Sequence, residues 1–135
     1  MRLRFYPEPR RFRVARGDIT IADYGQVMLD ADEMVSFQTA SGRQCDFAAK
    51  EWGFYPTSSP NSRMKNEGFK VALVRDVNNK IQINVVETGK IDSFNSYLSA
   101  HQSGPHVVCW LDELGGAELD AIETIFGQGE RSDGS

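Results

Sequence analysis

Short runs in which apolar and polar residues alternate are the feature that most limits how this chain can fold. Four of them are centred on Ile19/Ile21, Val27/Leu29, Val35/Phe37 and Cys45/Phe47. Successive side chains of a strand point to opposite faces, so a period of two indicates strands with one buried face. Turn-forming residues such as Ser41-Gly42 separate the runs. The pattern predicts a meander of short antiparallel strands.

Longer apolar runs follow at Phe69–Asp76 and Lys80–Glu87, on either side of Asn78-Asn79. Asparagine tolerates the left-handed backbone that tight turns require, so these runs predict a long β-hairpin. Further on, Ile91, Phe94 and Leu98 have the spacing of one helix face.

The last third of the chain predicts one more strand and one more helix. The apolar run His106–Trp110 reads as a central strand, and its place after a helix favours a parallel crossover connection. Leu119, Ile122 and either Ile125 or Phe126 predict a short amphipathic helix, and Gly127 suits its C-terminal end.

These elements predict an α+β domain built mainly from antiparallel sheet, a meander plus a long hairpin, with one or two covering helices. A small closed β-barrel with a helix is the alternative, because repeated short strands also build barrels. A chain of 135 residues is typical of one domain. We expect a basic flexible arm over residues 1–16, a globular domain over 17–127 and a flexible tail over 128–135.

Charge is distributed unevenly along the chain. The first 17 residues hold six arginines and one glutamate, a net charge of +5, whereas the remaining residues carry −9. A basic arm of this kind is one route to nucleic-acid or anionic-surface binding. We rank it third among the functions considered, because a short arm on an acidic domain is also typical of a solvated leader.

Several functional classes lack their sequence signals. The Gly-rich phosphate loops are absent, and no cofactor is expected. His101 and His106 flank a Gly-Pro break and do not have metal-ligand spacing, so no metal site is predicted. Cys45 and Cys109 lie in apolar runs, where a thiol acts as a small core side chain. With no secretory signal and no bilayer-length apolar run, we expect a cytoplasmic protein without a membrane span.

Residues 52–65 are the segment most suggestive of a binding site. Aromatic rings at its start offer flat apolar surface for stacking, and polar and basic side chains in the following loop offer donors to carboxylate or phosphate groups. Loops of this length without regular structure often carry function. The predicted ligand-binding residues are Trp52, Tyr55, Asn61, Arg63 and Lys65.

The leading functional hypothesis is therefore a non-catalytic accessory domain that holds a small polar or anionic ligand, or a protein partner, with residues 52–65. The second hypothesis is a small enzyme with a carboxylate-lined pocket near Asp112. We predict no catalytic residues, because Asp112 and Glu113 would point to opposite faces of an extended strand. The sequence thus favours binding over catalysis.

Overall fold

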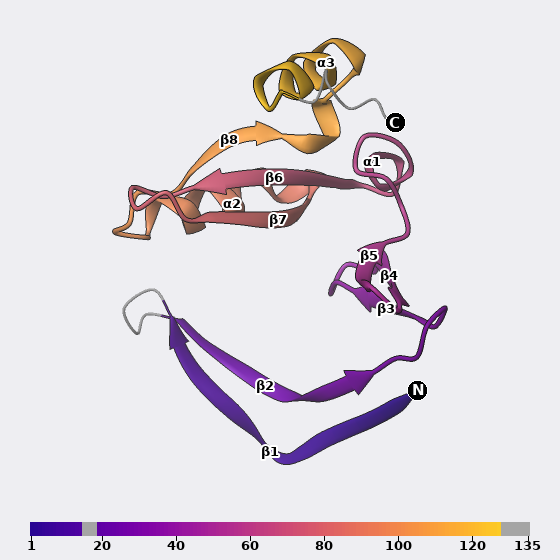
Figure 1. Ribbon diagram of the computed structural model, residues 1–135. Coiled ribbons are helices and arrows are strands. Elements are labelled where there is room, and N and C mark those ends of the chain that lie inside the picture. Colours follow the sequence, from indigo (N-terminus) through magenta and orange to yellow (C-terminus); the bar gives the residue numbers. More distant parts are fainter. Residues whose placement is uncertain (15–18, 128–135) are drawn as a thin grey trace.

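The computed structural model describes residues 1–14 and 19–127, and its architecture is α+β (Figure 1). Strand pairing in this part of the chain is antiparallel throughout, and the strands form three sheets that do not close into a barrel. The predicted fold class is confirmed, and the barrel alternative is wrong. The strands are β1 (Arg2–Val14), β2 (Ile19–Met28), β3 (Met34–Gln38), β4 (Gln44–Lys50), β5 (Gly53–Pro56), β6 (Phe69–Arg75), β7 (Ile81–Glu87) and β8 (His106–Trp110).

Strands β1 and β2 pair into a two-stranded ribbon that stands apart from the other sheets (Figure 1). The sequence predicted a flexible arm over residues 1–16, but residues 2–14 form a strand, and residues 15, 16 and the predicted tail at 128–135 lie outside the described ranges. The strand has a physical reason. Apolar residues alternate with arginines in this segment, which is a strand pattern that the charge and proline content obscured.

The ribbon bends near its middle (Figure 1). Its register shifts between Phe5 and Arg10, a stretch that contains two prolines, which cannot donate a backbone hydrogen bond to a partner strand. On β2, Gly25 has φ +148°, and a Cβ atom at this position would lie 2.1 Å from the carbonyl oxygen of Arg4. Gly25 therefore permits the close approach of the two strands, and β2 is one bent strand where the sequence predicted two short ones.

The second sheet has the strand order β3-β4-β5, and the third has the order β7-β6-β8. The hairpin of β6 and β7 pairs Phe69 with Glu87 and Arg75 with Ile81, as the sequence predicted. In its turn Asn79 has φ +64°, and the carboxylate of Asp76 accepts the N–H groups of Asn78 and Lys80.

Three helices are present in the described residues: α1 (Arg63–Asn66), α2 (Ile91–Ser99) and α3 (Gly116–Ile125). Helix α2 covers one face of the β7-β6-β8 sheet, where Phe94 and Leu98 pack against Ala72, Val74 and Val86. None of these helices is long and apolar enough to cross a bilayer. Helices α2 and α3 confirm the predicted helical segments.

The other face of this sheet is covered only at one end. There Phe69 and Val71 pack against Cys45 and Met64, which come from β4 and α1. Both cysteines are free thiols, and burial raises the pKa of Cys45. The β3-β4-β5 sheet and α1 are thereby joined to the main hairpin.

Strand β8 does not form the parallel crossover that the sequence favoured. It pairs antiparallel with β6 at the edge of the sheet, with Ala72 opposite Trp110 and Arg75 opposite His106. Trp110 is half-buried, and its ring contacts that of Phe94 at 5.9 Å between centroids. The connection through α2 is long enough to reverse direction, so the order strand, helix, strand did not fix the orientation of the last strand.

Candidate functional site

Aromatic residues of the predicted binding segment are exposed on the outer strand β5 and in the turn that precedes it. The rings of Trp52 and Tyr55 stack with centroids 5.8 Å apart and an interplanar angle of 27°. Trp52 and Phe54 are each 67% exposed. These rings therefore lie at the surface and offer apolar area to another molecule.

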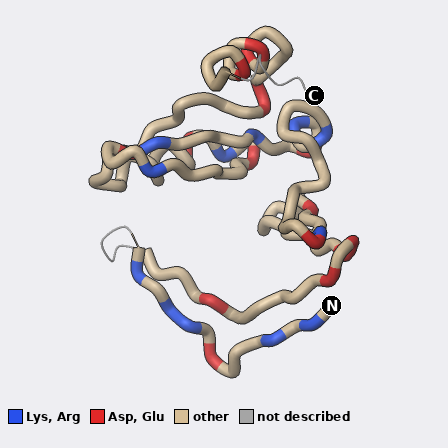
Figure 2. The backbone as a smooth tube through the Cα atoms, viewed as in Figure 1, with Lys and Arg blue, Asp and Glu red and all other residues tan. Residues whose placement is uncertain are grey.

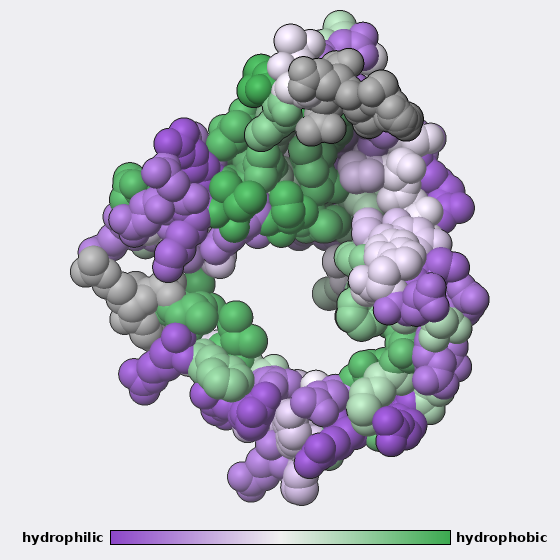
Figure 3. All heavy atoms as spheres, in the orientation of Figure 1, coloured by the Kyte–Doolittle hydropathy of each residue, from purple (hydrophilic) through white to green (hydrophobic). Residues whose placement is uncertain are grey.

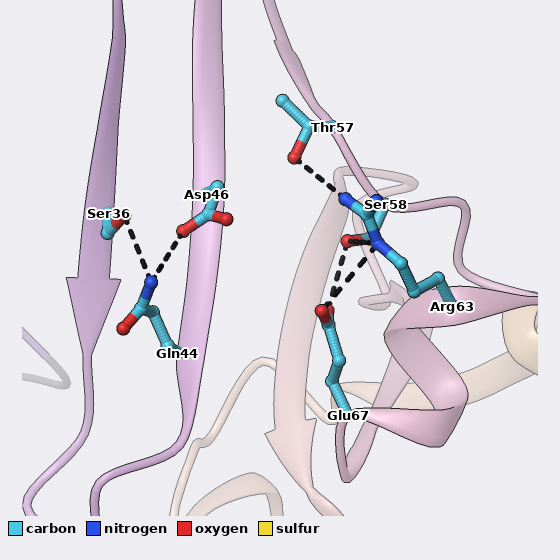
Figure 4. A network of polar contacts seen from close by, with 7 residues as sticks. All are labelled: Ser36, Gln44, Asp46, Thr57, Ser58, Arg63 and Glu67. Carbon is cyan, nitrogen blue, oxygen red and sulfur yellow. Dashed lines mark hydrogen bonds and ion pairs between the residues drawn. The ribbon is translucent and has the colours of Figure 1, made fainter.

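Arg63 is exposed, as expected for a binding residue, but its guanidinium is bound within the chain (Figure 4). Its Nε donates to the hydroxyl of Ser58 at 2.9 Å, and its Nη2 donates to the hydroxyl of Thr57 at 3.3 Å. It also lies 3.6 Å from a carboxylate oxygen of Glu67. Ser58 is buried and donates to the same carboxylate at 3.0 Å. Arg63 thus braces the loop against α1.

The other two predicted residues, Asn61 and Lys65, differ in whether they are bound within the chain. Asn61 donates from Nδ2 to the carbonyl oxygen of Leu114 at 2.9 Å, which ties the loop to the chain segment before α3. Lys65 lies on the exposed side of α1. The structure therefore brings Trp52 and Tyr55 together, but uses Asn61 and Arg63 to hold the loop.

A polar network that sequence reasoning missed lies beside Arg63 on the adjacent strands (Figure 4). Gln44 donates from Nε2 to the hydroxyl of Ser36 at 3.2 Å and to Asp46 at 3.1 Å. Hydrogen bonds from Ser36 and Gln44, with a smaller contribution from Arg63, lower the pKa of Asp46. The readable signal was the alternation of Gln44 and Asp46 with the apolar Cys45 and Phe47, which places the polar pair on one face.

A shallow hollow of about 240 Å³ borders Trp52 and is also lined by Ala31, Asp32, Lys50 and Glu51. Lys50 pairs with Asp32 there, and this hydrogen bond raises the pKa of Lys50. Neither Arg63 nor Asp112 lines this hollow. The aromatic pair and the hollow form the part of the predicted site that remains open to a ligand.

Asp112 and Glu113 are arranged differently from the sequence expectation. Both carboxylates contact the amino group of Lys70, at 2.8 and 2.9 Å, because Leu111–Glu113 is a 3₁₀ turn (η3) and not an extended strand. Asp112 is 2% exposed and also accepts the backbone N–H of Val71 at 2.8 Å.

The charge state of this cluster follows from its contacts. Burial raises the pKa of Asp112, but the hydrogen bonds from Lys70 and Val71 outweigh it and leave the pKa below its usual value. The hydrogen bond to Asp112 correspondingly raises the pKa of Lys70. A carboxylate held ionised and fully partnered is suited to joining η3 to β6 and poorly suited to proton transfer.

The β1–β2 ribbon is a further candidate surface, which the sequence predicted only as a basic arm and not as an apolar face. Directly opposite residues of an antiparallel pair share a face. On the apolar face Leu3 pairs with Val27, and beyond the register shift Phe12 pairs with Ile21 and Val14 with Ile19. Phe12 is 49% and Ile21 52% exposed.

The opposite face of the ribbon is basic. It carries Arg2 and Arg4 on one side of the bend and Arg11 and Arg13 on the other. Figure 2 shows these positive charges along β1, in contrast to the acidic residues of α3. Arg10 and Asp23 differ from these arginines, because their register places them on the face of Phe12 and Ile21, where they form an ion pair at 2.7 Å that lowers the pKa of the Asp23 carboxyl group.

Comparisons with known proteins add no relative, because no family model, curated protein or solved structure matches this chain. Among the described residues, histidine, cysteine and acidic side chains form no cluster of three or more that could hold a metal ion. Function must therefore be argued from the surfaces described above.

Proposed function

We propose that this chain is a non-catalytic association domain that binds a protein partner through the apolar face of the β1–β2 ribbon. The observation that carries the proposal is the half-exposure of Phe12 and Ile21, two large apolar side chains paired on one ribbon face. Two-stranded ribbons on their own are marginally stable in water, and large exposed apolar patches mark interaction sites. A partner that covered this face would stabilise the ribbon.

The internal pairing of Asp112 and the engagement of Arg63 support a binding function over an enzymatic one. The proposal therefore keeps the accessory role expected from the sequence and moves the main contact surface from residues 52–65 to the ribbon. The basic face would then keep the ribbon soluble and leave the apolar face for the partner.

The ribbon hypothesis predicts that Ile21→Asp abolishes partner binding, because it places a charge in an apolar contact. The measurement is affinity capture from cells that express the protein, followed by comparison of the bound proteins. Thr20→Asp is the matched control, since it adds the same charge one residue away on the opposite face. Proteins that bind the Thr20→Asp chain and not the Ile21→Asp chain support the proposal. Equal capture by both variants would contradict it.

A second candidate function is the binding of a small polar or anionic ligand over the stacked rings of Trp52 and Tyr55. The observation that favours it is the exposed ring stack beside the hollow that contains Lys50. Flat aromatic surface next to a cation suits a ligand with both an apolar face and a negative group.

For this second function, we expect Trp52→Ala to abolish ligand-induced shifts in a nuclear magnetic resonance titration with small carboxylates and phosphate esters. Phe54→Ala is the control, because its ring is equally exposed but lies outside the stack. A ligand that binds both variants equally well would place the binding site elsewhere.

A further inference from the structure

The open face of the β7-β6-β8 sheet is a second uncovered apolar surface. Val85, Ile83 and Ile81 alternate along β7 and share the face of Val71 and Leu73. Val71 is buried against the neighbouring sheet, but Ile83 is 57% and Ile81 66% exposed. The face is thus covered at the Val71 end and open at the Ile81 end.

The total accessible surface of the chain is larger than that expected for a folded monomer of its mass. The chain exposes 9768 Å². If residues 15–18 and 128–135 were assigned the full surface of an extended chain, about 1,800 Å², the described residues would still expose roughly 1,300 Å² more than a folded monomer of their mass. A stable interface buries about 800 Å² on each partner. The excess is therefore large enough to supply one.

Within one chain the two apolar surfaces do not cover each other. The ribbon contacts the chain segment that follows it at the end where β1 begins. There the amino group of Met1 lies 3.1 Å from a carboxylate oxygen of Glu33. Figure 3 shows apolar residues of the ribbon and of the β7-β6-β8 sheet on opposite sides of a central opening. In this view each surface faces, across the opening, a counterpart of the same apolar character.

The charge distribution favours contact between the ribbon of one chain and the body of another. Strand β1 of the ribbon lies in the basic part of the sequence, with +5 over the first 17 residues against −9 for the rest. A ribbon brought to the body of another copy would approach an acidic molecule, which assists encounter. In a twofold dimer the ribbon of each chain would cover the sheet of the other, so that both apolar surfaces of both chains are buried. A different partner would need a separate matching surface for the ribbon and for the sheet.

We infer that the partner is a second copy of this chain, and that each ribbon lays its apolar face on the open face of β6 and β7 of the other copy. This inference rests on the proposed function and names its partner. The product is a twofold dimer with exchanged ribbons, in which Ile21 and Phe12 of one chain cover Ile83 and Ile81 of the other.

Mixing of two variants tests the exchange. Ile21→Asp alters only the ribbon and Ile83→Lys only the sheet, so each alone should be monomeric by analytical ultracentrifugation while the unchanged chain is dimeric. In a mixed dimer one ribbon and the sheet it contacts are both unaltered, and the other contact joins an aspartate to a lysine. An equimolar mixture should therefore regain the dimer. Both residues are exposed in the single chain, so circular dichroism should show folded variants, and Thr20→Asp should stay dimeric.

Two outcomes would overturn the inference: an unchanged chain that is monomeric, whether or not it sediments with a DNA duplex, and a mixture of the two variants that stays monomeric. A monomeric chain whose captured partners still depend on Ile21 would end the dimer inference and leave the proposed function standing. Capture independent of Ile21, together with a monomeric chain, would remove both.

Discussion

Replacement of Asp112 with alanine is expected to lower the free energy of unfolding by about 3–5 kcal/mol, the usual effect of removing one partner of a buried ion pair. The carboxylate is buried, and it binds the amino group of Lys70 and the backbone N–H of Val71. Alanine would leave both donors without this acceptor in the interior. Denaturant unfolding monitored by circular dichroism measures the change.

Glu113→Ala provides the matched control for this prediction. Glu113 contacts the same amino group of Lys70, but its side chain is largely exposed, so the expected loss is below about 1 kcal/mol. Equal effects of Asp112→Ala and Glu113→Ala would show that burial and the bond to Val71 contribute nothing, and would contradict the structural role assigned to Asp112.

The acid dependence of stability supplies an independent check. The folded-state pKa of Asp112 is lowered, so its contribution is complete at neutral pH and is lost as the pH falls below about 3.9, the ordinary value for aspartate, and through the folded-state pKa. The Asp112→Ala chain should therefore lose less stability than the unchanged chain over this acid range. A parallel loss in both chains would mean that other carboxylates account for the acid sensitivity.

Strands that pair with near neighbours in sequence could be predicted, whereas strands whose character depends on distant contacts could not. The hairpin of β6 and β7 was readable because its apolar period and its turn residues are local. The direction of β8 depends on pairing with β6 across α2, and no local pattern encodes it. Strand β1 was missed because arginines occupy the polar positions of its alternation, which gives the segment the composition of a charged arm.

Only part of the candidate site could be predicted from the sequence. Tyr55 is exposed on the outer strand β5, and Trp52 is exposed in the turn just before it. The internal binding of Arg63 depends on Ser58 and Glu67. The spacing of Arg63 and Glu67, four residues apart from the first residue of α1 to its C-cap, was a readable signal of an internal ion pair.

Adjacent carboxylates at 112 and 113 show how a wrong backbone assumption changes a chemical inference. On an extended strand they would diverge, but in the 3₁₀ turn both reach Lys70. The same turn buries one of them and exposes the other. The backbone conformation at the end of a strand therefore decides whether two adjacent acidic residues diverge or converge on one partner.

Met64→Ala is expected to cost about 2–5 kcal/mol, the range for truncating a fully buried long apolar side chain. Met64 is 1% exposed and packs from α1 against Cys45, Phe69 and Val71, so it joins the helix to two sheets. Its loss should also loosen the loop that Arg63 braces, because α1 positions that arginine. Hydrogen exchange at Ser62 and Met64, whose N–H groups bond to the carbonyl of Ser59, should accelerate in the variant.

The control is Lys65→Ala, one residue along on the exposed side of α1, with an expected change within about 0.5 kcal/mol. A cost for Met64→Ala as small as that of the control would mean that α1 is not anchored in the core and that the loop at residues 52–65 is held by its polar contacts alone.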